Sequence, residues 1–181
     1  MFITIVIIAL LVITIIVVYN SIIKLKIRAN NAWSDIDVQL KKRYDLINNL
    51  VETVKGYSYF EKSILEDIAE KRSIAMNEDK ISRKAGIEEG ITGTLKSLFA
   101  VAENYPDLKA NKNFLYLQKQ LVDIENTISM ARRYYNAVVR DYNQLINVFP
   151  QNIIAKMFGF KELEYFEVEN EREREVVNVS T

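Results

Sequence analysis

The chain has 181 residues, with 24 basic and 24 acidic side chains and neither cysteine nor histidine. Without cysteine there is no disulfide, thiolate nucleophile or cysteine-ligated metal, and without histidine there is no Ser-His-Asp triad. The small numbers of glycine (5) and proline (2) favour long uninterrupted helices in one domain of ordinary size.

The first 23 residues carry no charged side chain and predict a transmembrane anchor. Residues 2–18 are apolar except for two threonines, whose hydroxyls can bond to the helix backbone, and about 20 such residues cross a bilayer. Tyr19 suits the membrane–water interface. A cleaved signal peptide is the alternative, but the segment has no basic start and no small residues before a cleavage point. We therefore expect an uncleaved anchor over residues 1–23.

Basic residues follow the apolar segment at once, at Lys24, Lys26 and Arg28. The positive-inside rule then predicts that the N-terminus lies outside and that the following domain lies in the cytoplasm. The same three side chains are also suited to contact anionic lipid headgroups.

Residues 24–160 are expected to form a helical bundle domain of four helical segments. In the first, apolar residues recur in steps of three and four, which is the period of a helix, at Trp33, Ile36, Leu40, Tyr44, Ile47, Val51 and Val54. No proline interrupts residues 24–55, so the membrane helix can continue to a stop at Gly56. A second segment covers residues 58–77, and the charged stretch 77–85 is expected to be an exposed connection.

The third segment covers residues 87–105 and is expected to end at Pro106. Gly86, Gly90 and Gly93 either allow a neighbouring helix to approach closely or leave a frayed start. The fourth segment has a heptad pattern typical of coiled coils and is expected to stop at Pro150. Its apolar positions are Phe114, Leu117, Leu121, Ile124, Ile128, Ala131, Tyr135, Val138, Tyr142, Leu145 and Phe149.

Such helices cannot bury their apolar stripes alone, so the sequence predicts an all-α fold. We expect an N-terminal transmembrane helix followed by an antiparallel, up-and-down four-helix bundle with long helices. The apolar residues 153–160 are expected to cap the bundle rather than lie on the bilayer. Residues 161–181, with 3 basic and 7 acidic side chains, are expected to form an acidic, flexible tail.

Several polar residues lie beside the predicted apolar stripes and are the candidate site residues. They either form hydrogen bonds that fix the helix register or line a polar pocket or docking surface, and the first interpretation is favoured because buried polar groups must be satisfied. These residues are Arg43, Glu125, Asn126, Arg132, Asn136 and Asn143.

No catalytic residue, cofactor or metal site is predicted. A ferritin-like di-metal centre needs Glu-x-x-His pairs, which this chain cannot supply. An all-carboxylate magnesium or calcium site using Asp35, Asp37, Asp123 or Glu125 is the remaining metal alternative, but single carboxylates on long helices are usually solvated or paired. Nucleic-acid binding is not expected, because no basic face with interleaved aromatic residues is present.

The chain resembles the LemA family of bacterial membrane-anchored proteins over about residues 1–167. The resemblance rests on the order and spacing of several strings, among them Asn31-Ala-Trp33, Asp35-Ile-Asp-Val-Gln-Leu40, Arg43-Tyr-Asp-Leu-Ile47, Val54-Lys-Gly-Tyr57, Glu103-Asn-Tyr-Pro-Asp-Leu-Lys-Ala-Asn111, Phe149-Pro-Gln-Asn-Ile-Ile-Ala155 and Phe158-Gly-Phe160. It implies one N-terminal span and an antiparallel helical bundle, and it implies no reaction. Asn48 stands where the family usually has proline, and Phe60 stands where it often has histidine. One branch of the family is associated with magnetosome membranes, and no residue points to that branch.

These observations predict a non-enzymatic scaffold or protein-interaction module at the bacterial cell (inner) membrane. The expected partners are the lipid bilayer and unidentified membrane or envelope proteins, and self-association is left open. The alternative function is a bundle that binds lipid or a small molecule at the membrane surface. A carboxylate hydrolase is the third and least favoured hypothesis.

Overall fold

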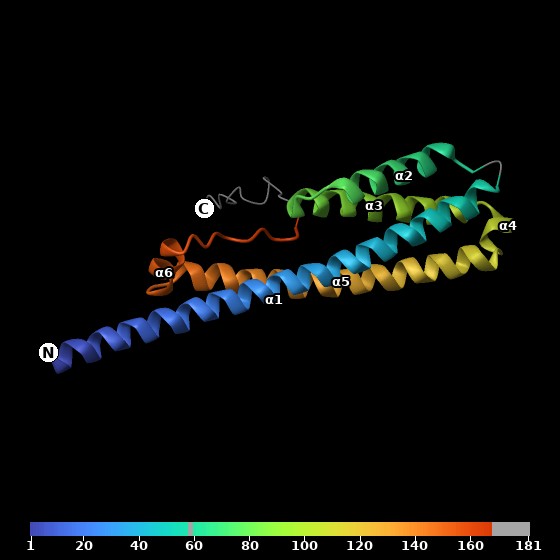
Figure 1. Ribbon diagram of the computed structural model, residues 1–181. Coiled ribbons are helices and arrows are strands. Elements are labelled where there is room, and N and C mark those ends of the chain that lie inside the picture. Colours follow the sequence, from blue (N-terminus) through green and yellow to red (C-terminus); the bar gives the residue numbers. More distant parts are fainter. Residues whose placement is uncertain (58–59, 168–181) are drawn as a thin grey trace, which may run out of the picture. The chain divides into compact units, whose positions relative to one another are not determined.

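The computed structural model describes residues 1–57 and 60–167, and these residues form six helices and no strand (Figure 1). In chain order the helices are α1 (Phe2–Lys55), α2 (Lys62–Asn77), α3 (Ile81–Ala102), α4 (Pro106–Lys109), α5 (Lys112–Asn147) and α6 (Gln151–Met157). The all-α prediction is confirmed.

Helix α1 is one unbroken helix of 54 residues, about 80 Å long at 1.5 Å per residue. No glycine or proline occurs in it, and it ends directly before Gly56. Within the described part of the chain it is the one helix long and apolar enough to cross a membrane, and its most apolar 18-residue window is not buried at all. The expected continuation of the apolar segment into the first bundle helix is confirmed.

The expected connection over residues 77–85 is wrong. Helix α2 ends at Asn77, and only three residues separate it from α3, which begins at Ile81. Lys84, Ala85 and Glu88 are buried, so the first turns of α3 carry charged residues into the protein interior. The charged residues of this stretch resemble those of a solvent-exposed loop, because the sequence does not show which side chains of other helices face Lys84 and Glu88.

This shift places the three glycines inside α3 rather than at a frayed start. A Cβ atom on Gly90 would lie 3.3 Å from Cε of Lys71, so this glycine leaves room for the Lys71 side chain of α2. Gly86 and Gly93 have open space around the equivalent position.

Pro106 also has a different role from the expected one, because α3 ends at Ala102 and Pro106 occupies the first position of α4.

The chain divides into two compact units. Of the described residues, unit 1 contains 1–40 and 126–165, and unit 2 contains 41–57, 60–125 and 166–167. In unit 2, α2 and α3 form an antiparallel hairpin (Figure 1). The start of α5 runs antiparallel to α3, since Thr92 lies beside Glu125 while the rings of Phe99 and Phe114 are 6.1 Å apart.

In unit 1, α1 and α5 are antiparallel. The rings of Trp33 and Tyr135 lie 5.6 Å apart, and further along both helices Val18 and Ile22 share a buried cluster with Tyr142 and Ile146. Ile154 and Ala155 of α6 complete this cluster, so α6 covers one end of the core. The heptad stripe of α5 stops short of its predicted last member, because the helix ends at Asn147 and Phe149 is exposed.

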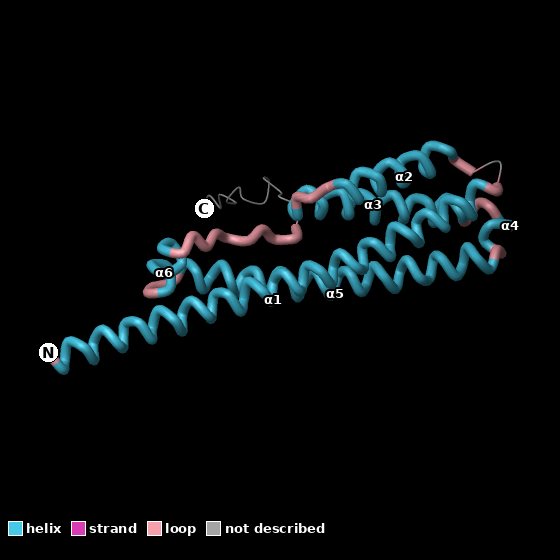
Figure 2. The backbone as a smooth tube through the Cα atoms, in the orientation of Figure 1, coloured by secondary structure: helices cyan, strands magenta, loops and turns pink. Residues whose placement is uncertain are grey.

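Residues 161–165, which the sequence assigned to an acidic tail, are held against α5 by hydrogen bonds. Asn143 acts as a peptide mimic: its Nδ2 donates to the carbonyl of Leu163 (3.0 Å), and its Oδ1 accepts from the Leu163 amide (2.9 Å). Tyr142 and Tyr135 donate their hydroxyls to the carbonyls of Lys161 and Glu164. Figure 2 draws this segment as a loop. The rest of the predicted tail, residues 168–181, lies outside the described residues.

Replacing Asn143 by leucine is expected to release this loop while α1 and α5 stay folded, because two hydrogen bonds are lost and the Leu163 backbone groups have no substitute partner. Hydrogen–deuterium exchange should show faster exchange of the Leu163 amide and a loss of about 1–3 kcal/mol in its protection. The exposed neighbour Gln144, changed to leucine, is the matched control. Equal protection of Leu163 in both variants would contradict the role of Asn143.

Candidate functional site

Arg43 of α1 is 1% exposed and lies between two carboxylates of other helices. Its Nη1 is 2.9 Å from Oε2 of Glu88 on α3, and its Nη2 is 2.9 Å from Oε2 of Glu125 on α5. Arg43 follows Leu40 by three residues and precedes Ile47 by four, so the helical period turns its side chain toward the same side as the predicted apolar stripe. One guanidinium therefore joins three helices of unit 2.

Two hydroxyl groups complete this arrangement, which we call the Arg43 cluster (Arg43, Tyr44, Glu88, Thr92 and Glu125). Tyr44 donates its hydroxyl to Oε1 of Glu88 at 2.5 Å, and Nη2 of Arg43 donates to Oγ1 of Thr92 at 2.8 Å. Oγ1 of Thr92 also lies 3.3 Å from Oε2 of Glu125. Among the described residues no hydrogen-bond partner reaches Nε of Arg43, which is buried.

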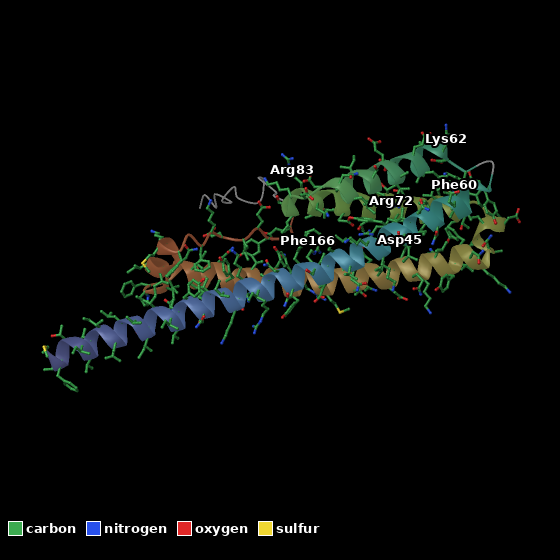
Figure 3. The ribbon with its side chains drawn as sticks, in the orientation of Figure 1. Asp45, Phe60, Lys62, Arg72, Arg83 and Phe166 are labelled. Atoms are coloured by element: carbon green, nitrogen blue, oxygen red, sulfur yellow. The ribbon has the colours of Figure 1, made fainter. Side chains whose placement is uncertain are left out.

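Helix α2 contacts the same region through Arg72, one of the residues labelled in Figure 3. Its Nε donates to the backbone carbonyl of Tyr44 at 2.9 Å. Helices α1, α2, α3 and α5 therefore all take part in polar contacts around Arg43 and Tyr44.

Burial raises the pKa of Glu88 above its ordinary value of 4.5, although the Arg43 charge and the Tyr44 hydrogen bond act in the opposite direction. The nearby charge of Glu125 adds to the increase, and that of Lys84 opposes it. Desolvation is the largest cause because Glu88 is only 5% exposed. The cluster is thus electrostatically costly, and its hydrogen bonds partly offset that cost.

Chemically, this arrangement is suited to fixing the register of the helices. Both carboxylates are paired with the guanidinium or with hydroxyl groups; the side chain of Glu88 is buried, and that of Glu125 is 40% exposed. The described residues contain no group of three or more acidic side chains that could hold a metal ion. None of Asp35, Asp37, Asp123 and Glu125 belongs to such a group.

A second polar group, which the sequence analysis missed, lies in a groove of about 430 Å³ between α2 and α3. Lys71 pairs with both carboxylate oxygens of Asp67 and donates to Thr94 at 3.1 Å, and Thr94 donates to Asp67 at 2.6 Å. The hydrogen bonds from Lys71 and Thr94 lower the pKa of Asp67. The i,i+4 spacing of Asp67 and Lys71 could have predicted their ion pair. No sequence pattern indicates that Thr94 of α3 lies beside them.

The other candidate residues do not join the Arg43 cluster. Asn143 is buried and holds the loop of unit 1, Asn136 is half-buried, and Asn126 and Arg132 are exposed on α5. Lys24, Lys26 and Arg28 are exposed on α1, and Nζ of Lys26 lies 5.9 Å from the centre of the Phe160 ring. Tyr44, Glu88 and Thr92 were missed, because only the packing of α1 against α3 shows that they meet Arg43.

Replacing Arg43 by methionine is expected to lower the free energy of unfolding by about 3–5 kcal/mol, because Glu88 is left buried without its cation. Urea unfolding of the full chain in detergent micelles, followed by the loss of helical circular dichroism, measures the change. Lys42→Met, one position away and exposed, is the control and should change stability by less than about 0.5 kcal/mol.

The double variant Arg43→Met, Glu88→Leu should recover much of the loss, because both charges leave the interior together. A single variant Arg43→Met as stable as the control would show that the ion pair does not stabilise unit 2.

The raised pKa of Glu88 makes the folded state bind a proton more readily than the unfolded state. Its contribution to the free energy of unfolding is therefore fully present below about pH 4.5 and is lost as the pH rises through the folded-state pKa. We expect the stability of the wild type relative to Glu88→Gln to decrease as the pH rises above about 4.5, as measured by urea midpoints. The exposed neighbour variant Glu89→Gln should show no such trend. A relative stability that increases with pH would mean that Arg43 outweighs desolvation.

Comparison with known proteins identifies the family of this chain. The LemA family model matches residues 32–180. Magnetosome protein MamQ of Magnetospirillum gryphiswaldense is 25% identical over 179 residues, covering 84% of this chain and 66% of that protein. Magnetosome protein MamQ 2 of Paramagnetospirillum magneticum is 26% identical over 180 residues, covering 85% and 66%.

Protein LemA of Metamycoplasma hominis is 28% identical over 166 residues, covering 89% of this chain and 74% of that protein. The chain thus spans just under two thirds of the length of the MamQ relatives, and its similarity to the two kinds of relative is about equal. Because the family model matches most of its residues, the chain belongs to the LemA family.

Proposed function

We propose that this chain is a non-enzymatic, membrane-anchored helical module that holds other membrane or envelope proteins at the bacterial cell membrane. The observation that carries the proposal is helix α1. Its apolar N-terminal window is entirely unburied, and the same helix continues without a break into the helical domain. A long unburied apolar surface is stable in lipid and unstable in water.

The proposed orientation has the N-terminus outside and the helical units in the cytoplasm. Lys24, Lys26 and Arg28 follow the apolar window directly and are exposed, as positive residues on the cytoplasmic side of a single span would be.

The proposal of a non-enzymatic role is supported by the way the charged groups are paired. Arg43 and Glu88 pair with each other in the interior, and the partly exposed Asp67 and Lys71 bond to each other and to Thr94 in the α2–α3 groove. A catalytic acid or base needs a free path to a substrate proton, and these groups are committed to neighbouring helices.

The face of α5 opposite its buried stripe is the proposed protein contact within unit 2. Leu115, Tyr116 and Val122 are 46%, 62% and 51% exposed there, while Phe114 and Leu121 face the core. Tyrosine with adjacent aliphatic residues is a common composition for the centre of a protein interface.

A second candidate function is binding of lipid or of a small molecule at the membrane surface. The α2–α3 groove would be the small-molecule site, because Lys71 and Thr94 present polar groups in it. The exposed apolar residues around α6 would be the lipid site.

A photo-crosslinking amino acid at Tyr116, introduced into the full chain in cells, is expected to capture a defined membrane or envelope protein. The yield of the same adduct should fall in the variant Val122→Lys, because the charge interrupts the exposed apolar face of α5. Glu89→Lys, a charge change at an exposed position of α3, should leave the yield unchanged. Recovery of self-adducts and lipid alone, identified by mass spectrometry, would argue against the scaffold function.

A further inference from the structure

The packing of unit 1 shows at which residues of α1 the unburied apolar segment ends and the packed core begins. Val18 and Ile22 are buried with Tyr142 and Ile146 at the end of α5 and with Ile154 and Ala155 of α6. Ile15 and Leu25 pack against the same cluster. About 20 residues cross a hydrocarbon core, so a span that starts at Phe2 ends within this stretch of α1. The corner between α5 and α6 therefore lies at the depth where the helix would emerge from a bilayer.

Around this corner the chain exposes five large apolar side chains, which we call the α6 edge. Their exposed fractions are 41% for Val148, 78% for Phe149, 58% for Ile153, 62% for Met157 and 49% for Phe158. Single exposed apolar residues are ordinary on protein surfaces, whereas five within eleven residues of the chain are typical of a segment that contacts a partner or a membrane. The buried positions Ile154 and Ala155 lie between them, so α6 presents one face to the core and another to its surroundings.

Aromatic contacts join the α6 edge directly to the end of the apolar segment of α1. The ring of Tyr19 is 4.8 Å from that of Phe158 and 5.7 Å from that of Phe160. Lys26 extends its ammonium to 5.9 Å from the Phe160 ring. Tyrosine and lysine are residues that bridge the apolar and aqueous sides of a membrane interface. The α6 edge is thus continuous with the surface of α1 that faces lipid in the proposed function.

We propose that the α6 edge is embedded in the interface of the lipid bilayer beside α1, so that the protein contacts its membrane through both a span and an interfacial patch. The inference rests on the proposed membrane anchor. Lipid fits these residues better than a protein would, because the ring contact between Tyr19 and Phe158 places them beside the end of the apolar segment that faces lipid in the proposed function. A lone span can rotate and tilt, whereas a second contact limits the rotation and tilt of unit 1.

The test uses the full chain in vesicles of phosphatidylcholine and phosphatidylglycerol and exploits the absence of native cysteine. Single cysteines at Ile153 and at Met157 are labelled with an environment-sensitive fluorophore and challenged with lipids that carry a spin label near the headgroup. A probe at Val12→Cys, inside the apolar window, tests the anchor: its quenching is measured with lipids whose spin label lies deeper along the acyl chain. Arg133→Cys is the aqueous control, because the Trp33–Tyr135 contact places it about 20 Å along α1 from Tyr19.

The probes at Ile153 and Met157 are expected to be quenched at least about twofold more than the probe at Arg133. A further test combines the Met157 probe with the substitution Ile153→Glu. This added charge should reduce the quenching of the probe, whereas Gln144→Glu on α5 should not. If the Val12 probe is quenched and both α6 probes behave like Arg133, the inference is overturned and the anchor stands. If the Val12 probe is also unquenched, the proposed anchor fails, and the inference fails with it.

Discussion

The structure depends on the fact that α1 is one unbroken helix whose surroundings change along its length. Its first part is apolar on all sides and unburied, and its later part has a single apolar stripe that must be covered. Isolated stripes on long helices are not stable in water, so the neighbouring helices of each unit serve to cover them. In unit 1 this is done by α5 and α6, and in unit 2 by α2, α3 and the start of α5.

Arg43 gives unit 2 a specificity that apolar packing alone would not provide. Leucine, isoleucine and valine side chains can exchange neighbours at a small cost, whereas a guanidinium held by Glu88, Thr92 and Glu125 has directional bonds. A shift of one helical turn would leave a buried charge without its partner. The cluster adds little net stability over apolar residues, because desolvation offsets much of the attraction, but it disfavours other registers.

The α5–α6 corner shows why two alternatives posed from the sequence were not exclusive. Capping of the bundle and contact with the bilayer were treated as competing roles for residues 153–160. Helix α6 has two faces, and Ile154 and Ala155 are buried in the core while Ile153 and Met157 are exposed. A short helix at the end of a bundle can therefore cap the core and still present an apolar face outward.

The sequence by itself determined the helical class, the apolar segment, the stripes of α1 and α5 and the stops at Gly56 and near Pro150. These follow from local chemistry: hydropathy, the helical period and the two residues that break helices. Tertiary structure alone decided that Lys84 and Glu88 are buried residues of a helix rather than residues of a loop. It also decided that Tyr44 and Thr92 complete the Arg43 cluster. Finally, it decided that Phe149 is exposed rather than part of the core. Periodicity reports which face of a helix is covered, but it does not report which residues of another helix cover it. Since the burial of a charge depends on the partner that meets it, those features were fixed only when the helices packed.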